Sequence, residues 1–329
     1  MNGWFARVVR LWKPFSGTVE TISSEFVPSM VAEGLDRNGL LPSTLSNFWR
    51  DFLQRIVVPN PGPMTGPGTN TYLLGEREVW VIDPGPALLE HGEALLAAIA
   101  GRPVRGIVVT HTHGDHSPLA AWLHERTGAP RIGRLARHAA YQDPTFVAEV
   151  IPDDGYVLET DVGEVQLLAT PGHASNHICP WWPAAGVLFT GDHVLQGVTP
   201  VILPPDGDMG EYLASLARLQ TLPLRAIAPG HGGLITDPHA NLSALVAHRL
   251  KREAKVLAAL GAVAAQGAVP VEELLPVAYD DVPVAMHAWA RYSLLAHLLK
   301  LVNEQRALCL GTAPVGNEPD HRRFGIPAP

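Results

Sequence analysis

The sequence contains few cysteines, only Cys179 and Cys309 among 329 residues. Two cysteines cannot build the disulfide framework of a small secreted domain, and their scarcity fits a reducing compartment. We therefore expect a cytoplasmic protein. Cys179 lies in the apolar segment HICPWW, so we expect it to be an inert core residue and not a nucleophile.

Long hydrophobic runs are missing as well. No stretch approaches the roughly 18 apolar residues that a membrane-spanning helix needs, so we expect no transmembrane segment. Arg7, Arg10 and Lys13 interrupt the apolar residues of the first segment, MNGWFARVVRLWKPF. A secretory signal needs an uninterrupted apolar stretch, so we interpret this segment as mature sequence whose apolar face docks on the protein.

Charged residues are scarce, at 17% of the chain, and the formal net charge is -8. This balance argues against a polyanion-binding protein, and a hydrophobic share of 47% excludes intrinsic disorder. Residues 59–239 hold 19 acidic and 9 basic side chains, which gives this segment alone a charge of -10. Such a segment either repels nucleic acid or holds cations.

The chain divides into four segments of different character. We expect an N-terminal extension over residues 1–56, docked on the core, and an α/β catalytic domain over residues 57–239, where short β-rich runs alternate with helical patterns. Residues 240–310 have three amphipathic segments and sparse strand signals, so they predict a small, mostly helical module. The Pro- and Gly-rich residues 311–329 predict an irregular tail.

The segment THTHGDHS has the densest cluster of chemically active side chains, directly after the apolar run GIVV. In an extended segment side chains point the same way every two residues, so His111 and His113 can share one cation. Asp115 and His116 follow closely and can bind a second ion at the spacing of a two-metal site. The segment therefore predicts parts of two metal sites.

Three further polar motifs follow predicted strands: PGH with His173, TGD with Asp192 and PGHG with His231. The carboxyl ends of strands are where α/β proteins place their sites. We therefore expect all these side chains to meet at a single edge of a sheet.

These four motifs, in this order and spacing, resemble the metallo-β-lactamase superfamily, which implies a four-layer αββα sandwich over about residues 57–239. Carried over position by position, the resemblance implies two metal sites that share the carboxylate of Asp192. The first would use His111, His113 and His173, and the second Asp115, His116 and His231. Asp192 stands where class B1 and B2 lactamases have a cysteine ligand, so antibiotic hydrolysis is not expected.

A narrower resemblance rests on NPGPMTGPGTNTYLLG, GDHVLQG and HRLKREAKVLAAL. These segments are similar to the branch of the superfamily that contains β-lactamase-like protein 2, whose C-terminal module is winged-helix-like. That branch includes an endoribonuclease, and polyketide thioesterases resemble it too.

The ligand set of histidines and aspartates suits two divalent ions, Zn²⁺ first, with Mn²⁺, Fe²⁺ or Ni²⁺ as alternatives. Two bridged cations produce hydroxide at neutral pH, so we predict a metal-bridging hydroxide as the nucleophile, oriented by Asp115. His177 is the candidate for protonating a leaving group or binding substrate, with a supporting or core role as an equal alternative. For His193 and Asp83 we expect structural roles.

The leading functional hypothesis is a hydrolase acting on an ester or thioester, such as an acyl-CoA, of a small organic acid. The alternatives are an endoribonuclease acting on single-stranded RNA, a lactonase, and a persulfide dioxygenase with one non-heme iron. Residues 240–310 carry 7 basic and 6 acidic side chains, a balance of only +1 that gives RNA weak support.

Overall fold

The structure is a computed structural model that describes residues 52–314 and 320–327. The N-terminal extension predicted to dock on the core comprises residues 1–56. Only residues 52–56 of it lie within the described ranges, so its predicted docking falls outside them. Strand β1 (Leu53–Val57) belongs to the first sheet, so the sheet begins earlier in the chain than the expected boundary at residue 57.

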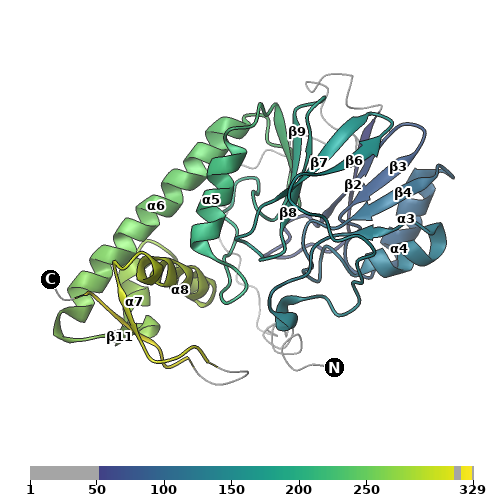
Figure 1. Ribbon diagram of the computed structural model, residues 1–329. Helices are drawn as coiled ribbons and strands as arrows, with labels where there is room; N and C mark the ends of the chain where they lie inside the picture. The colour runs from purple at the N-terminus through teal and green to yellow at the C-terminus, as the bar shows by residue number, and fades with distance from the viewer. Residues whose placement is uncertain (1–51, 315–319, 328–329) are drawn as a thin grey trace, which may run out of the picture.

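Two five-stranded sheets form the body of the molecule (Figure 1). The first has the order β1-β2-β3-β4-β5, and its further strands are β2 (Asn70–Leu74), β3 (Val79–Ile82), β4 (Val104–Val108) and β5 (Arg131–Ile132). The second has the order β10-β9-β8-β7-β6, with β6 (Tyr156–Thr160), β7 (Gly163–Ala169), β8 (Ile178–Trp182), β9 (Val187–Gly191) and β10 (Ala226–Pro229).

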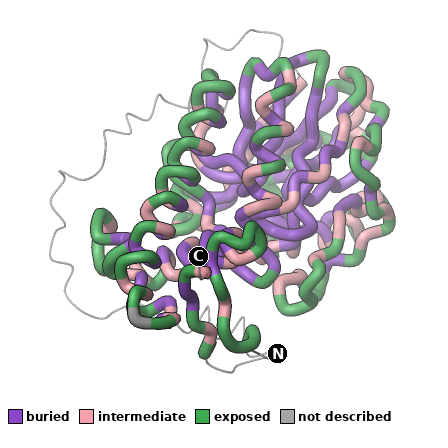
Figure 2. Tube along the Cα trace, turned by 60° about the vertical axis from the view of Figure 1, so that its left-hand side comes forward, coloured by how far each residue is buried: buried purple, intermediate pink, exposed green. Residues whose placement is uncertain are grey.

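The two sheets pack face to face and are covered by helices on their outer faces. Trp80 and Val108 of the first sheet share one buried cluster with Trp182 and Phe189 of the second. Helices α3 (Leu89–Ile99) and α4 (Leu119–Thr127) cover the first sheet, and α5 (Met209–Leu219) and α6 (Pro238–Val263) cover the second. The predicted four-layer αββα sandwich is confirmed, and Figure 2 shows its buried residues concentrated in the interior of the body.

Local sequence explains where the two helices over the second sheet begin. The Asp208 carboxylate accepts a hydrogen bond from the Glu211 amide at 2.8 Å, which caps the first turn of α5. Asp237 caps α6 in the same way, and Pro238 follows at the first helical position, where its missing N–H is not needed.

The direction of the strands explains how the polar motifs meet. Strand β7 pairs antiparallel with β8, β8 pairs antiparallel with β9, and β9 pairs parallel with β10. The chain therefore leaves β7, β9 and β10 at the same end of the second sheet, while β4 belongs to the first sheet. The expectation of a single sheet edge was wrong in this respect, because the ligand-bearing loops come from both sheets of the sandwich.

The C-terminal module contains more β-structure than the sequence predicted. Its elements are β11 (Val269–Pro270), α7 (Val271–Ala278), α8 (His287–Asn303), β12 (Leu308–Leu310) and β13 (Arg323–Gly325), with the strand order β11-β13-β12. Strand β13 lies in the segment predicted to be irregular, and the fully buried Phe324 anchors it in the core of the module. Strands of two or three residues are too short to show a periodic pattern.

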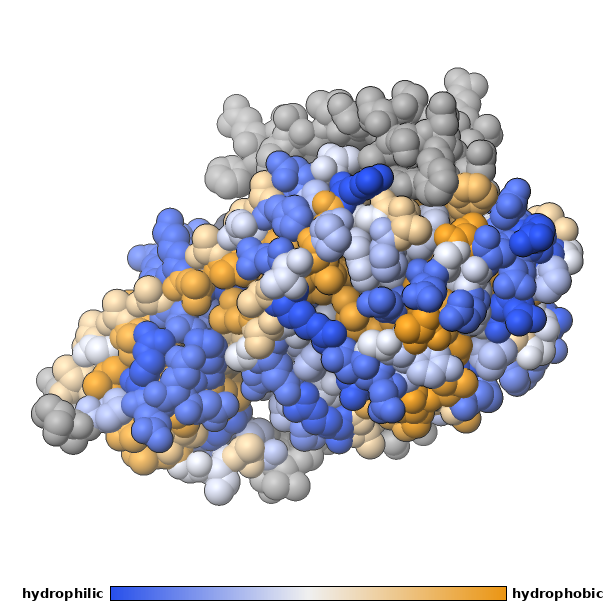
Figure 3. Space-filling model, turned by 45° about the horizontal axis from the view of Figure 1, so that its top comes forward, coloured by the Kyte–Doolittle hydropathy of each residue, from blue (hydrophilic) through white to orange (hydrophobic). Residues whose placement is uncertain are grey.

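Helix α6 extends from the sandwich to the C-terminal module, where it packs against α7 and α8 (Figure 1). Within the described ranges, no helix combines the length and the apolar character that crossing a bilayer requires. On the face drawn in Figure 3, hydrophobic residues form separate areas between hydrophilic ones.

Candidate metal centre

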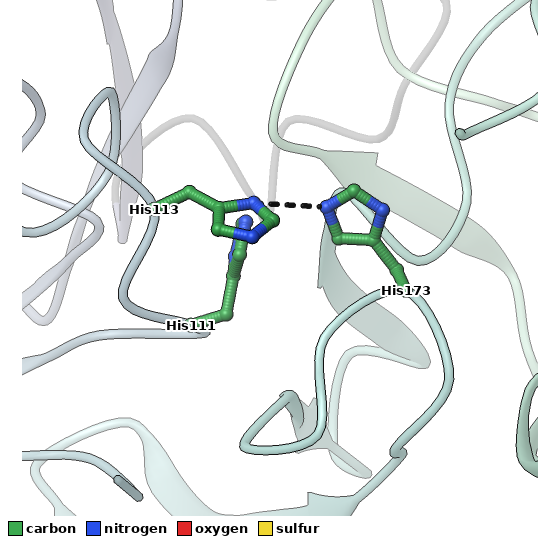
Figure 4. A group of neighbouring side chains, drawn as sticks. All are labelled: His111, His113 and His173. Atoms are coloured by element: carbon green, nitrogen blue, oxygen red, sulfur yellow. Dashed lines mark hydrogen bonds between the residues drawn. The ribbon is translucent and has the colours of Figure 1, made fainter. Parts of the chain in front are cut away.

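The first group of candidate ligands consists of three imidazoles from two loops. His111 and His113 follow β4, and His173 lies in the turn after β7, facing them (Figure 4). One nitrogen of each ring lies within 4.8 Å of the others, and His113 Nδ1 is 3.2 Å from His173 Nε2. The three rings therefore converge on one point.

The second group combines two carboxylates with two imidazoles: Asp115, His116, Asp192 and His231. Asp115 Oδ2 is 3.2 Å from His231 Nε2 and 3.6 Å from His116 Nε2. Ligands about 2.1 Å from a tetrahedral zinc ion lie roughly 3.4 Å from one another, so these separations suit one cation.

Asp192 lies between the two groups. Its Oδ1 is 3.3 Å from His116 Nε2 and 3.2 Å from His231 Nε2. Its Oδ2 is 3.9 Å from His173 Nε2, a member of the first group. Each carboxylate oxygen thus faces a different group, which is the placement of a bridging ligand.

Hydrogen bonds on the far side of the rings hold four of the imidazoles. His111 Nδ1 lies 3.1 Å from Thr110 Oγ1. His173 Nδ1 donates to the carbonyl of Val201 at 2.8 Å, and His231 Nδ1 donates to the carbonyl of Gly68 at 3.2 Å. His116 Nδ1 lies 3.0 Å from Asp83 Oδ2. An imidazole that donates through Nδ1 keeps its lone pair on Nε2, where a cation can bind.

Asp83, for which the sequence predicted a structural role, contacts both the start of the ligand loop and His116. Its φ of 51° places it in the left-handed region, which asparagine and aspartate tolerate better than most residues. In this conformation its carboxylate accepts from the Thr110 amide at 2.7 Å and from Thr110 Oγ1 at 2.8 Å. Asp83 therefore ties β3 to the start of the loop that contains His111 to His116.

Burial keeps the first group neutral. It lowers the pKa of His111 well below the ordinary value, and the neighbouring His116 and His113 lower it further. It also lowers the pKa of His113 to about 4, with His173 acting in the same direction, and the pKa of His173 is lowered too. At neutral pH these rings have free lone pairs and are ready to bind a cation.

The second group is charged. Burial opposes the imidazolium form of His231, but the carboxylates of Asp192 and Asp115 raise its pKa to about 10. Burial opposes the charged form of His116 as well, and Asp115, Asp192 and Asp83 raise its pKa well above the ordinary value. His231 and His116 in turn keep the pKa of Asp192 well below its usual range despite burial. A cation binding here therefore displaces protons from two imidazoles.

Unpartnered atoms show that the residues fit metal ions. His111 Nε2, His116 Nε2, His231 Nε2 and Asp192 Oδ1 are buried and make no hydrogen bond. Buried polar atoms normally have a partner, so the one such atom of the first group and the three of the second fit a ligand bound at each group. A Cβ at Gly230 would come 2.7 Å from Asp192 Oδ1, so glycine is required for this approach.

His177 and His193 lie behind the ligand rings. His177 is fully buried, stacks on His111 with ring centroids 5.1 Å apart, and its Nδ1 is 3.0 Å from Thr170 Oγ1. This position favours a supporting role for His177, and its catalytic role stays a prediction. His193 is also fully buried, and neither of its ring nitrogens has a hydrogen-bond partner.

Cys179 is buried in β8, and burial raises the pKa of its thiol to about 12. A thiol with so high a pKa stays protonated at neutral pH, which agrees with the expected inert role.

Sequence reasoning missed the loop that supports His173. Asp206 accepts hydrogen bonds from the amide and the hydroxyl of Ser175, at 2.9 and 2.6 Å. Val201 supplies the carbonyl that holds the His173 ring. Neither residue belongs to a motif, and only the tertiary structure brings them to His173.

Fold, site and sequence agree on the class of protein. The model of the metallo-beta-lactamase superfamily matches residues 64–231, and that of the beta-lactamase associated winged helix domain matches residues 271–312. The chain therefore belongs to the metallo-beta-lactamase superfamily and has the winged helix domain associated with it.

Individual relatives are similar over most of the chain. A beta-lactamase-like protein 2 homolog of Caenorhabditis elegans is 32% identical, over 64% of this chain and 71% of the relative. An atrochrysone carboxyl ACP thioesterase of Aspergillus fumigatus is also 32% identical, over 70% of this chain and 74% of the relative. The crystal structure of a metallo-beta-lactamase family protein from Thermus thermophilus has a TM-score of 0.66 and 25% identity, covering 84% of this chain and 98% of that one.

Proposed function

We propose that this protein is a dinuclear metal-dependent hydrolase that cleaves a thioester, or an ester, of a small organic acid. The position of Asp192 carries the proposal, because one of its oxygens faces each ligand group. Zn²⁺ is the ion that we propose. All seven donors are imidazole nitrogens or carboxylate oxygens, a set that Mn²⁺, Fe²⁺ and Ni²⁺ also accept.

Two bound divalent cations lower the pKa of water and polarise the substrate carbonyl. Asp115 has the most exposed carboxylate of the centre, with 30% of its side chain accessible. It can therefore accept a hydrogen bond from an incoming water molecule and orient it toward the carbonyl. Two divalent cations would bring about four positive charges, and Asp115 and Asp192 supply two negative ones. The centre with both metals bound would therefore attract anionic acyl substrates.

The thioester is the proposed substrate class because one of the relatives is named an acyl carrier protein thioesterase. Single-stranded RNA and lactones are the alternatives that the test must distinguish. A persulfide dioxygenase needs only one iron, whereas two complete ligand groups support two cations.

The test is hydrolysis of a panel of acyl-CoA and acyl-cysteamine thioesters by zinc-loaded protein, measured as free thiol. We expect the Asp192→Ala variant to lose at least one metal and about 1,000-fold or more in rate, beyond the 10–100-fold typical of residues that support a ligand. The control is Asp281→Ala, which removes an exposed carboxylate paired with Arg252 and Lys255 in the C-terminal module. It should keep the wild-type rate and metal content.

The outcomes separate the parts of the proposal. A wild-type protein that binds no metal, or an Asp192→Ala variant with unchanged rate, would contradict the metal centre. Two bound metals without turnover of any thioester would contradict the substrate class, and RNA and lactones would then be assayed with the same pair of variants.

A further inference from the structure

Helix α6 has an unusual buried charge. The guanidinium of Arg249 belongs to a residue that is only 3% exposed, and no ion pair to it occurs among residues 52–314 and 320–327. It lies over the ring of Tyr212, 5.2 Å from the centroid, and its Nη2 donates to the carbonyl of Pro200. A buried cation without an anion is costly, so its few contacts need an explanation.

The contact with Pro200 leads directly to the metal centre. The next residue, Val201, provides the carbonyl that accepts the Nδ1–H of His173 at 2.8 Å. That hydrogen bond fixes the ring so that Nε2 points to His113 Nδ1, 3.2 Å away (Figure 4). A shift of the Val201 carbonyl would therefore turn the His173 ring away from the first ligand group.

The loop around Val201 is held unevenly. On its C-terminal side, Asp206 binds Ser175 and the Tyr141 hydroxyl donates to the carbonyl of Pro204. On its N-terminal side, Gln196 Oε1 accepts a hydrogen bond from the Gly233 amide at 2.7 Å, residues 197–199 are exposed, and Pro200 is buried. Arg249 holds the loop at this point, one residue before the carbonyl on which His173 depends.

We propose that Arg249 is a positioning residue, which fixes the loop at Pro200 and thereby sets the His173 ring for metal binding. The inference rests on the proposed function only in that His173 is taken as a ligand. It gives a role to the segment HRLKREAKVLAAL, in which Arg249 lies, and it makes α6 a structural link between the winged helix domain and the metal centre.

Metal titration of the apoprotein tests this without an activity assay. Co²⁺ is added to wild-type protein and to Arg249→Met and Arg249→Lys variants, and visible absorption with zinc competition gives the affinity of each binding step. The step that His173→Ala abolishes identifies the first group. We expect Arg249→Met to weaken this step about 10- to 100-fold, as loss of a ligand's support does, and to leave the other step unchanged. Arg249→Lys, which keeps a donor, should recover part of the loss.

Arg252 provides a matched control on the same helix. It also lies over a tyrosine ring, 4.3 Å from the centroid of Tyr279, and donates to a backbone carbonyl, that of Ala278 at 2.7 Å. Its contacts are all in the C-terminal module, so Arg252→Met should lower thermal stability and leave both binding steps at wild-type affinity.

Three outcomes would overturn the inference. The first is a folded Arg249→Met variant with wild-type metal affinities. The second is a loss of metal affinity in Arg252→Met equal to that in Arg249→Met. The third is an Arg249→Met variant in which both binding steps are weakened equally. If Arg249→Met does not fold, Arg249→Lys carries the test, and wild-type affinity at the first step would then contradict the role of the guanidinium. A wild-type protein that binds no Co²⁺ or Zn²⁺ would overturn the proposed function as well, whereas failure limited to the variants would leave it standing.

Discussion

The molecule has two buried clusters of charged groups, and they differ in what compensates their charge. At the metal centre, the buried Asp192 faces two imidazoles, His116 at 3.3 Å and His231 at 3.2 Å, which must lose their protons before a metal ion can bind. Between α6 and α8, the buried Glu253 is paired with Lys300 and Arg306, each at 2.8 Å. Buried charge must be compensated in both places. The chain supplies the compensation itself at Glu253, whereas at the metal centre the ligand atoms converge on positions that suit cations.

This difference predicts that the Glu253 cluster stabilises the fold and that the cluster of candidate ligands binds metal. Changes at Glu253 should act on folding and leave metal binding intact, since its partners all lie in α6, α8 and the residues that follow. Changes around the candidate ligands should act on metal binding with a small effect on folding. Each prediction below tests one side of this separation.

The largest effect is expected from Glu253→Gln. Removing the buried carboxylate leaves Lys300, which is 11% exposed, with only the more exposed Glu304 as an ion-pair partner, and this costs about 3 kcal/mol in the free energy of unfolding. Urea denaturation measures this cost, and the Co²⁺ titration should give two unchanged binding steps. Glu304→Gln is the matched control, because Glu304 pairs with the same Lys300 and Arg306 but is 40% exposed. Its cost should stay below about 1 kcal/mol. Equal costs for the two variants would contradict the structural role of Glu253.

A second prediction concerns Asp83, which supports His116 from behind. Asp83→Asn replaces the carboxylate that holds His116 Nδ1 at 3.0 Å, so the affinity of the second ligand group should fall about 10- to 100-fold. Metal titration with zinc competition measures this, and the first group should lose less affinity, because Asp83 reaches it only through Thr110 Oγ1, which lies 3.1 Å from His111 Nδ1.

Asp143→Asn controls for the loss of a buried carboxylate. Asp143 accepts from Ser117 Oγ at 2.6 Å and contacts no candidate ligand ring. We expect its replacement to lower stability and to change either affinity by less than about threefold, below the range for a residue that supports a ligand. A comparable loss of affinity in both variants would show that the metal centre responds to any disturbance of its loop.

The candidate ligands are easier to find in the sequence than the residues that hold their side chains. His111, His113, Asp115 and His116 are neighbours in one motif, so short-range spacing reveals them. The contacts that hold His173 join residues 28 and 31 positions apart, and the Arg249 contact spans 49 positions, so no local pattern contains them.

The fold shows the same division. Long amphipathic helices such as α6 and α8 were predicted from their periodicity, because each repeats its apolar positions over several turns. Strands β5, β12 and β13 have two or three residues each and were missed. They form because neighbouring strands and the buried Phe324 stabilise them, which is tertiary information.

The smallest expected effect is a pH dependence at the structural cluster. Burial raises the pKa of Glu253, but His297, Lys300 and Arg306 more than offset it and lower the pKa to about 2. An unfolded glutamate titrates near pH 4.5, so the folded state binds its proton less readily. The stability that this carboxylate contributes is complete above about pH 4.5 and is lost as the pH falls toward 2.

Wild-type protein and Glu253→Gln should therefore differ most above pH 4.5 and converge below it. At pH 3.5, one unit below the unfolded pKa, we expect the difference in the free energy of unfolding to have fallen by about 1.4 kcal/mol. Thermal unfolding of both proteins across pH 3 to 7, without metal, measures it. A constant difference over this range would mean that Glu253 acts through packing instead of charge, and the comparison of charge compensation at the two clusters would then fail.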